Sequence, residues 1–336
     1  MSVQRRIGRV LVAARGHAAA ERVSVYEAFG IETVVVFDAS DAEDAHLDEA
    51  SWAAALPEGA PLLAALVGVA MDAGADAFDP SGTELAASEE AARLATSVGL
   101  AWLGARAELL AGEAAPSRAA TFARVPASAE VVAVTVLGDG EGGLVVVGTA
   151  RVRKDVALVG DLEAGLEAGL LAKASAAGSA LRVLGAATAW FRVGHDEDSE
   201  IFGWSYGLPE HHALLAVGET SLAAAAVRLH AGENLGLSTG RLAQLPGVRA
   251  VVRARTDGQA PALEAAWSRA EGTDCAPDDV IAVVRVEGPT PSAACVRAVA
   301  ALHALAEPSF HDARACADAL APWSASGAQR ATLGQT

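Results

Sequence analysis

Three short groups of polar residues in this sequence have side chains that could carry chemistry: Arg15-Gly16-His17, Asp196-Glu197-Asp198 and Glu210-His211-His212. The first group follows a strand-like apolar run, and the strand ends of α/β sheets often bind ligands. The second group offers the carboxylates that calcium prefers. The third group places a carboxylate beside two imidazoles, which are common metal ligands. What each group can do depends on the elements that hold it.

Each group also has a simpler structural interpretation. We expect Glu210-His211-His212 to be a solvated approach to a helix, or a helix N-terminus, where the helix dipole stabilises a glutamate. Adjacent histidines point in different directions on a helix, which disfavours a shared metal. Asp196-Glu197-Asp198 fits the exposed tip of a hairpin, because further calcium ligands do not follow at a suitable spacing. Around Arg15, the glycine spacing of a dinucleotide-binding turn is missing.

Composition excludes several classes of function. The 336-residue chain has a formal net charge of −17, so its surface on average repels nucleic acids and anionic membranes. No uncharged apolar run reaches the roughly 20 residues of a membrane-spanning helix. The first residues lack the apolar stretch of a signal peptide, so we expect a cytoplasmic protein. Cys275, Cys295 and Cys316 are far apart, which favours free buried thiols over a metal site or disulfides.

The first third of the chain alternates strands with helices, a pattern typical of a parallel sheet covered on both faces. The predicted strands are residues 9–14, 31–37, 75–78 and 100–103, and the predicted helices are 18–29, 61–73 and 88–98. The remainder mixes hairpins with helices. Its predicted hairpins are 131–137 with 144–148 and 187–193 with 199–204, its helices are 161–177, 220–230 and 292–305, and its other strands are 248–254 and 280–286. The fold class is therefore α/β followed by α+β.

These patterns divide the chain into five parts. We expect an α/β domain over 1–112, a linker over 113–130, a middle domain over 131–235 and a C-terminal domain over 236–323. Small polar residues fill 324–336, which we expect to be a flexible tail.

Several short stretches of sequence occur in an order that is found in a known family. They are Ala14-Arg15-Gly16-His17, Gly30-Ile31-Glu32-Thr33-Val34, Gly74-Ala75-Asp76-Ala77, Gly99-Leu100-Ala101-Trp102-Leu103-Gly104, Val134-Thr135-Val136-Leu137-Gly138-Asp139-Gly140 and Ser238-Thr239-Gly240-Arg241. From about residue 7 to residue 322, the chain resembles biotin carboxylase, the ATP-grasp subunit or domain of biotin-dependent carboxylases. The resemblance implies a Rossmann-like pre-ATP-grasp domain, an ATP-grasp-like middle domain and a biotin-carboxylase-like C-terminal domain.

The same resemblance identifies family features that this sequence lacks. Residues 113–130 stand where the family has a glycine-rich lid that closes over ATP, so the middle domain would be truncated. The family's metal-binding glutamates fall at Trp190 and, within one or two residues, at Phe202 or Trp204. Glu210 matches the family's bicarbonate-activating base. Without ATP, a metal or an anion clamp, that glutamate would have nothing to act on.

The first helix has a separate implication. In biotin carboxylases it contributes to a dimer interface through charged residues. The resemblance implies Glu21, Ser24 and Ala28 as the possible interface residues here, with Ser24 and Ala28 at the family's charged positions. If this helix still pairs, the interface is less charged than in the family. An alanine-rich surface would suit a large, apolar, obligate interface.

Together these losses favour a non-catalytic biotin-carboxylase-like protein without a cofactor. It would be a structural or regulatory subunit of a biotin-dependent acyl-CoA carboxylase complex, or a homo-oligomer. A small-molecule sensor or an enzyme of changed chemistry is the alternative, and it would need a polar pocket near Arg15, His17, Asp79 and Glu210. An active carboxylase would need a lid and metal ligands from elsewhere.

Overall fold

The computed structural model describes residues 6–38, 46–111, 130–153, 155–160, 162–194, 199–217, 220–236, 246–255, 258–259, 265, 267–268, 274–275, 279–305 and 311–333. Two large sheets organise these residues. The predicted linker, the acidic triplet 196–198 and the Ser-Thr-Gly-Arg stretch 238–241 lie outside the described residues, apart from Glu130.

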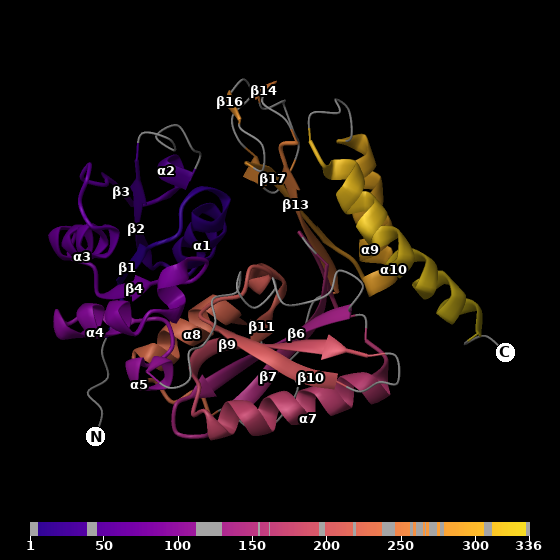
Figure 1. The fold of residues 1–336 in the computed structure, drawn as a ribbon, viewed down its shortest axis with the longest axis horizontal. Helices are drawn as coiled ribbons and strands as arrows, with labels where there is room; N and C mark the ends of the chain where they lie inside the picture. The colour runs from indigo at the N-terminus through magenta and orange to yellow at the C-terminus, as the bar shows by residue number, and fades with distance from the viewer. Residues whose placement is uncertain are drawn as a thin grey trace.

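A five-stranded parallel sheet forms the N-terminal region (Figure 1). Its strand order is β3-β2-β1-β4-β5, which places the first strand at the centre. The central strands are apolar runs buried on both faces, as a covered parallel sheet requires. The strands are β1 (Arg9–Val12), β2 (Glu32–Phe37), β3 (Trp52–Ala55), β4 (Ala77–Asp79) and β5 (Ala101–Trp102).

Helices cover both faces of this sheet. α1 (Gly16–Ala28) packs on the face that includes Val10 and Val12, whereas α3 (Leu62–Asp72) and α4 (Glu89–Ser97) pack on the opposite face. α4 begins where the Ser88 hydroxyl accepts a hydrogen bond from the Ala91 N–H, a regular N-cap. The shorter helices are α2 (His46–Glu49), η1 (Glu84–Ala87) and α5 (Ala107–Leu110).

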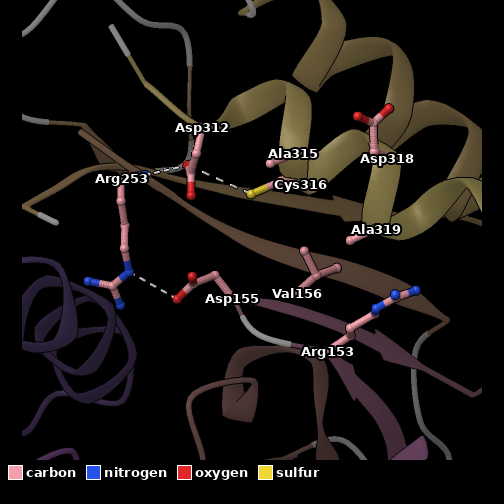
Figure 2. A pocket seen from close by; sticks show the side chains of 9 residues that line it. All are labelled: Arg153, Asp155, Val156, Arg253, Asp312, Ala315, Cys316, Asp318 and Ala319. Atoms are coloured by element: carbon pink, nitrogen blue, oxygen red, sulfur yellow. Dashed lines mark hydrogen bonds and ion pairs between the residues drawn. The ribbon is translucent and has the colours of Figure 1, made fainter. Parts of the chain in front are cut away.

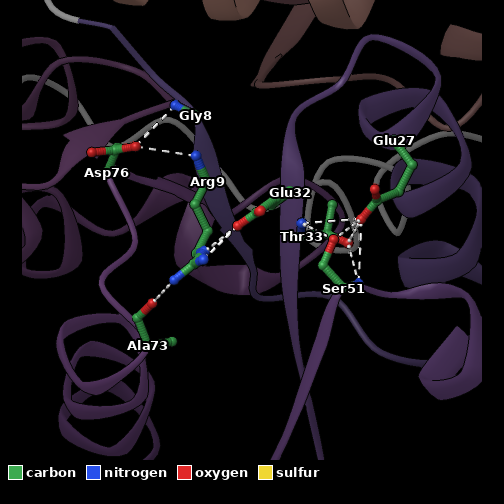
Figure 3. Close-up of polar contacts among 8 residues, drawn as sticks. All are labelled: Gly8, Arg9, Glu27, Glu32, Thr33, Ser51, Ala73 and Asp76. Carbon is green, nitrogen blue, oxygen red and sulfur yellow. Dashed lines mark hydrogen bonds and ion pairs between the residues drawn. The ribbon is translucent and has the colours of Figure 1, made fainter.

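Polar contacts fasten β1 and β2 to their surroundings (Figure 3). The Arg9 guanidinium donates to Glu32 Oε2 through Nε at 2.7 Å. Glu27 Oε1 accepts hydrogen bonds from the hydroxyl groups of Thr33 at 2.7 Å and Ser51 at 2.5 Å. Burial raises the pKa of Glu27, but the hydrogen bonds from Ser51 and Thr33 outweigh burial and lower the pKa overall.

An eight-stranded antiparallel sheet continues through the rest of the chain, in the order β10-β9-β6-β7-β8-β13-β17-β15. In the β6–β7 hairpin, Asp139 Oδ1 accepts hydrogen bonds from the backbone N–H groups of Glu141 and Gly143. The strands are β6 (Glu130–Asp139), β7 (Leu144–Arg153), β8 (Val156–Val159), β9 (Leu184–Val193), β10 (Ser199–Tyr206), β13 (Gly247–Arg253), β15 (Trp267–Ser268) and β17 (Val280–Glu287). Two short ladders pair β11 (Ala216–Val217) with β12 (Thr220–Ser221) and β14 (Gly258–Gln259) with β16 (Asp274–Cys275).

Four longer helices cover this second sheet (Figure 1). α7 (Ala164–Ala180) packs on one face of the β6–β9 region and α8 (Leu222–His230) on the other. α9 (Pro291–Ala304) and α10 (Ala313–Leu333) pack on β13 and β17. α1 also reaches this sheet, because Ala20 packs against Val251 and Val283. α1 therefore contacts the N-terminal, middle and C-terminal regions.

The fold class expected from the sequence is confirmed: a parallel sheet covered on both faces precedes a mixed α and β region. The strands β3 and β8 were not predicted, because β3 is mostly alanine and β8 has four residues. β8 pairs with β13, so one sheet continues across the boundary predicted at 235/236. α10 extends to Leu333, into the segment predicted as a flexible tail, since its alanines favour helix.

No helix in the described part of the chain is long and apolar enough to cross a membrane.

Candidate functional site

The loop that carries Glu210 is fixed against the N-terminal sheet. The Ser81 hydroxyl accepts a hydrogen bond from the Leu208 N–H at 2.9 Å. Gly207 makes this approach possible, because its φ is +86° and a Cβ there would lie 2.3 Å from Ser81 Oγ. The end of β10 is thereby joined to the turn after β4, and residues 208–212 are held at the interface between the two sheets.

A buried acid lies beneath this contact. Asp79 Oδ2 accepts a hydrogen bond from the Tyr26 hydroxyl at 2.8 Å, and its carboxylate lies 3.7 Å from Arg22 Nε. All three side chains are buried, and burial together with Asp79 raises the pKa of Tyr26. Arg22 also reaches the Leu208 carbonyl at 3.4 Å. Asp79 is therefore enclosed by its partners and does not line an open pocket.

A buried arginine links three segments that are far apart in the sequence. Arg249 on β13 donates to Glu21 on α1 through Nε at 3.0 Å and Nη2 at 2.6 Å. Its Nη1 lies 3.4 Å from Glu210 Oε2. The Arg249 side chain is 4% exposed and that of Glu21 is 9% exposed. Burial raises the pKa of Glu21, but the charge and hydrogen bonds of Arg249 outweigh it, so the pair remains ionised.

Three histidines lie close to this pair. Burial and the charge of Arg249 lower the pKa of His17 to about 4. His212 is fully buried, and burial with the charge of Arg22 lowers its pKa to about 4 as well. His211 lies with Nε2 3.5 Å from Thr135 Oγ1. Of the two arrangements predicted for residues 210–212, the solvated approach is wrong for both histidines, which are 3% and 1% exposed because the segment is packed between the sheets. The helix N-terminus is present, because His211 is the N-cap of the short helix η2 (His212–Leu214).

Trp190 occupies the sheet face next to this loop. It is 3% exposed, its core includes residues of α1 and α8, and its indole N–H donates to Ser205 Oγ at 3.0 Å. Phe202 packs against the same core. Trp204, however, packs on the opposite face with the α7 core, so it does not belong beside Trp190. The register of β10 shifts between Ile201 and Gly203, and this bulge explains why the sequence left the position uncertain.

Little space remains between Trp190 and the ion pair. A cavity of about 20 Å³ is lined by Trp190, Glu210, His211 and Arg249, with Asp155 at its edge. That volume suits about one water molecule. Within the described residues, no group of three or more His, Cys, Asp and Glu side chains could hold a metal ion. The arrangement here is a buried ion pair packed beside an indole, with space for little more than one water molecule between them.

The remaining predicted residues are dispersed. Arg15 pairs with Asp38 at the end of β2 and so does not join His17 and Glu210 in one pocket. Glu21, predicted on an interface face of α1, points inward to Arg249. Ser24 and Ala28 are exposed on α1. In the described contacts Arg15 pairs with Asp38 and Asp79 with Tyr26, whereas His17 and Glu210 both lie near Arg249.

A comparison with protein families agrees with this architecture. Residues 6–110 match the family model described as biotin carboxylase, N-terminal domain. The chain has a biotin carboxylase fold. Among solved structures, the biotin carboxylase domain of a single-chain bacterial carboxylase is 21% identical, with a TM-score of 0.73, and the match covers 88% of each chain. The biotin carboxylase domain of Hydrogenobacter thermophilus 2-oxoglutarate carboxylase is 16% identical, with a TM-score of 0.76 and coverage of 88% and 90%.

Some relatives with this biotin carboxylase fold are much longer. The urea carboxylase of Kluyveromyces lactis is 18% identical with a TM-score of 0.73, and the match covers 88% of this chain but 30% of that one. The urea amidolyase of the same organism is matched over 20% of its length. The chain therefore spans less than a third of either protein. No curated protein sequence matches it.

Sequence reasoning missed Arg249 and the burial of His212. The sequence did contain an indication of Arg249's role. Arg249 is a single charged residue inside the apolar run Val248-Arg249-Ala250-Val251-Val252, and this strand is buried on both faces. A charge at such a position requires a buried partner. The partner, Glu21, is more than 200 residues earlier, and no local pattern indicated it.

Proposed function

We propose that this chain is a non-catalytic biotin-carboxylase-like protein. It would act as a structural or regulatory subunit of a biotin-dependent acyl-CoA carboxylase complex, or as a homo-oligomer. One observation carries the proposal: the indole of Trp190 is packed on the sheet face where the resemblance expects a metal-binding glutamate. An indole has no oxygen ligand to offer a hard cation such as magnesium.

The surroundings of Glu210 support the same conclusion. A base needs room for its substrate, yet the cavity beside Glu210 holds about 20 Å³. Pockets for small molecules and cofactors measure roughly 300–1,000 Å³. Arg249 Nη1 lies 3.4 Å from Glu210 Oε2, and the other two nitrogens of Arg249 are bound to Glu21. Arg249 therefore links β13 to α1, and two of its three nitrogens are not available to bind a substrate anion.

The lengths of the relatives support a role in an assembly. The structures that share this fold include a urea carboxylase and a complete pyruvate carboxylase, of which the match covers 30% and 37% of the length. A chain that keeps this fold without a nucleotide site would suit a structural subunit that binds other proteins and catalyses no reaction. Its partners would be carboxylase subunits or further copies of itself.

Calorimetric titration with MgATP tests the loss of chemistry. We expect no binding by this chain, whereas the biotin carboxylase domain of 2-oxoglutarate carboxylase serves as the positive control. Magnesium-dependent ATP binding at micromolar affinity would overturn the proposal. Sedimentation velocity and co-purification with biotin-containing subunits then test the assembly role. A monomer that captures no carboxylase subunit would contradict it.

A ligand-binding role is the second candidate, and one observation favours it. The space beside Trp190 is nearly filled, but a cavity of about 620 Å³ shares Asp155 and Val156 with it. Binding there would use residues that the family comparison did not indicate.

A further inference from the structure

A large cavity lies between α10 and the ends of three strands (Figure 2). Its volume is about 620 Å³, within the range of small-molecule pockets. Charged residues come from both walls, and apolar residues lie between them. The lining consists of Arg153, Asp155, Val156, Arg253, Asp312, Ala315, Cys316, Asp318 and Ala319.

Two carboxylates face this cavity from opposite walls. Asp155, before β8, accepts a hydrogen bond from Arg253 Nε at 3.0 Å. Asp312, before α10, accepts one from the Arg253 backbone N–H at 2.7 Å through Oδ1. In Figure 2 the other oxygen of Asp312 points into the cavity, on the side where Asp155 lies. Arg253 thus holds the two carboxylates in place, one through its side chain and one through its backbone.

The charge balance of the lining favours a positive ligand. Among the described residues that line the cavity are three aspartates and two arginines, and the Arg253 guanidinium is already paired with Asp155. Burial raises the pKa of Asp312 and the charge of Asp155 adds to the rise, and together they outweigh the hydrogen bond and charge of Arg253 and the nearby His311, which lower it. A cation between the two carboxylates would stabilise the charged form of Asp312.

The chemistry of the other lining residues narrows the class of ligand. A metal ion is disfavoured, because no group of three or more acidic, histidine or cysteine side chains with suitable geometry occurs in the described ranges. An anion would meet three aspartates. Cys316 is buried with a raised pKa, so it presents a protonated thiol and no nucleophile. Val156, Ala315 and Ala319 offer an apolar surface that suits the methylene chain of an organic cation.

We propose that this cavity binds a small linear organic cation, an amine or a guanidine, with its charged group between Asp155 and Asp312. The methylene chain of the ligand lies along Val156 and the first turns of α10. Arg153 and Asp318, both exposed, stand at the rim. This cavity shares Asp155 and Val156 with the small cavity beside Glu210, but the proposal does not depend on the loss of ATP binding.

Calorimetric titration of the full chain with agmatine and with putrescine tests the proposal. We expect binding of at least one of them, and no binding of glutarate, which is similar in length and oppositely charged. Asp312→Asn keeps the oxygen that accepts from the Arg253 N–H and removes the charge. Hydrogen bonds to charged groups contribute enough that affinity should fall about tenfold or more.

Asp72→Asn is the matched control, because Asp72 is exposed on α3 in the N-terminal region and the substitution removes the same charge. It should leave the affinity unchanged, and circular dichroism should show all variants folded. Three outcomes would overturn the proposal: neither cation binds at millimolar concentration, Asp312→Asn binds as the wild type does, or Asp72→Asn weakens binding equally. The last would indicate attraction to the overall negative charge.

Discussion

Arg249 and Glu21 form a bidentate ion pair, although they are 228 residues apart in the sequence. Arg249 Nε lies 3.0 Å from Glu21 Oε1, and Arg249 Nη2 lies 2.6 Å from Glu21 Oε2. Arg249 belongs to β13 of the second sheet, and Glu21 belongs to α1, which covers the first sheet. Two parallel hydrogen bonds fix the guanidinium plane and not only its distance. The pair therefore sets the position of α1 against the C-terminal region.

Removing one member of this pair should destabilise the protein strongly. Glu21→Gln leaves the Arg249 charge buried without its counter-ion, and the expected loss in the free energy of unfolding is about 3 kcal/mol. Arg249→Met should cost a similar amount, and the double variant should cost less than the sum of the two. Urea denaturation followed by circular dichroism measures these differences.

The control for this prediction is an exposed pair. Glu200→Gln breaks the ion pair with Arg192. The side chain of Glu200 is 66% exposed and that of Arg192 is 45% exposed, so the free energy of unfolding should change by less than about 1 kcal/mol. Equal losses for Glu21→Gln and Glu200→Gln would show that the buried pair does not hold the regions together.

The buried histidine His212 should make stability depend on pH. Its pKa is about 4 in the folded protein and about 6.5 in the unfolded chain, so the unfolded chain binds more protons between these values. The stabilisation from the neutral, buried imidazole is therefore complete above pH 6.5 and is lost as pH falls toward 4. The loss from this one group is roughly 3 kcal/mol.

Urea denaturation at pH 7, 6, 5 and 4 checks this dependence. His212→Asn keeps a side-chain N–H for the Pro209 carbonyl, which Nδ1 approaches at 2.8 Å, and removes the titration. The variant should therefore show a shallower fall in stability than the wild type. His303→Asn, on the exposed face of α9, should leave the wild-type curve unchanged. Parallel curves for wild type and His212→Asn would rule out the assigned role.

Local patterns in the sequence indicated most of the elements. Continuous apolar runs indicated the central strands β1 and β2, and glycines with Asp139 indicated the β6–β7 turn. The order of short motifs indicated the biotin carboxylase fold, which the match over residues 6–110 supports. These features depend on neighbouring residues, so one sequence is enough to find them.

The site was harder to predict, because its contacts join distant segments. Arg15 follows β1 and Asp79 is the last residue of β4, and these strand ends alone suggested one pocket. In the structure Arg15 turns to Asp38 and Asp79 turns to Tyr26. Similarly, Trp204 was grouped with Trp190 until the β10 bulge assigned them to opposite faces. Side-chain partners and bulges are set by packing, which residue spacing does not report.

Trp190 should contribute more to stability than an exposed tryptophan. Trp190→Ala would leave a cavity on the sheet face and remove the hydrogen bond to Ser205, and we expect a loss of about 3–5 kcal/mol. Trp52→Ala removes a side chain that is 53% exposed and lies over Arg9, and should cost no more than about 1 kcal/mol. Denaturant midpoints distinguish the two. Similar midpoints would indicate that Trp190 fills space without supporting the core.

Gly207 should be the residue on which the position of the Glu210 loop depends. Its φ of +86° disfavours any side chain, and an added Cβ would lie 2.3 Å from Ser81 Oγ. Gly30→Ala is a matched control, because Gly30 has a φ of +69° but no atom within 4 Å of an added Cβ. That variant should show the backbone strain alone, about 1–2 kcal/mol.

Gly207→Ala should therefore be less stable than Gly30→Ala, because it adds a steric overlap to the same strain. It should also separate Ser81 from Leu208 and loosen the loop that buries His212. Hydrogen exchange at residues 208–215 measures this directly, and exchange should accelerate there in Gly207→Ala and stay at the wild-type rate in Gly30→Ala. Unchanged exchange in both variants would show that the loop is held by other contacts, with Arg249 to Glu210 as the first to examine.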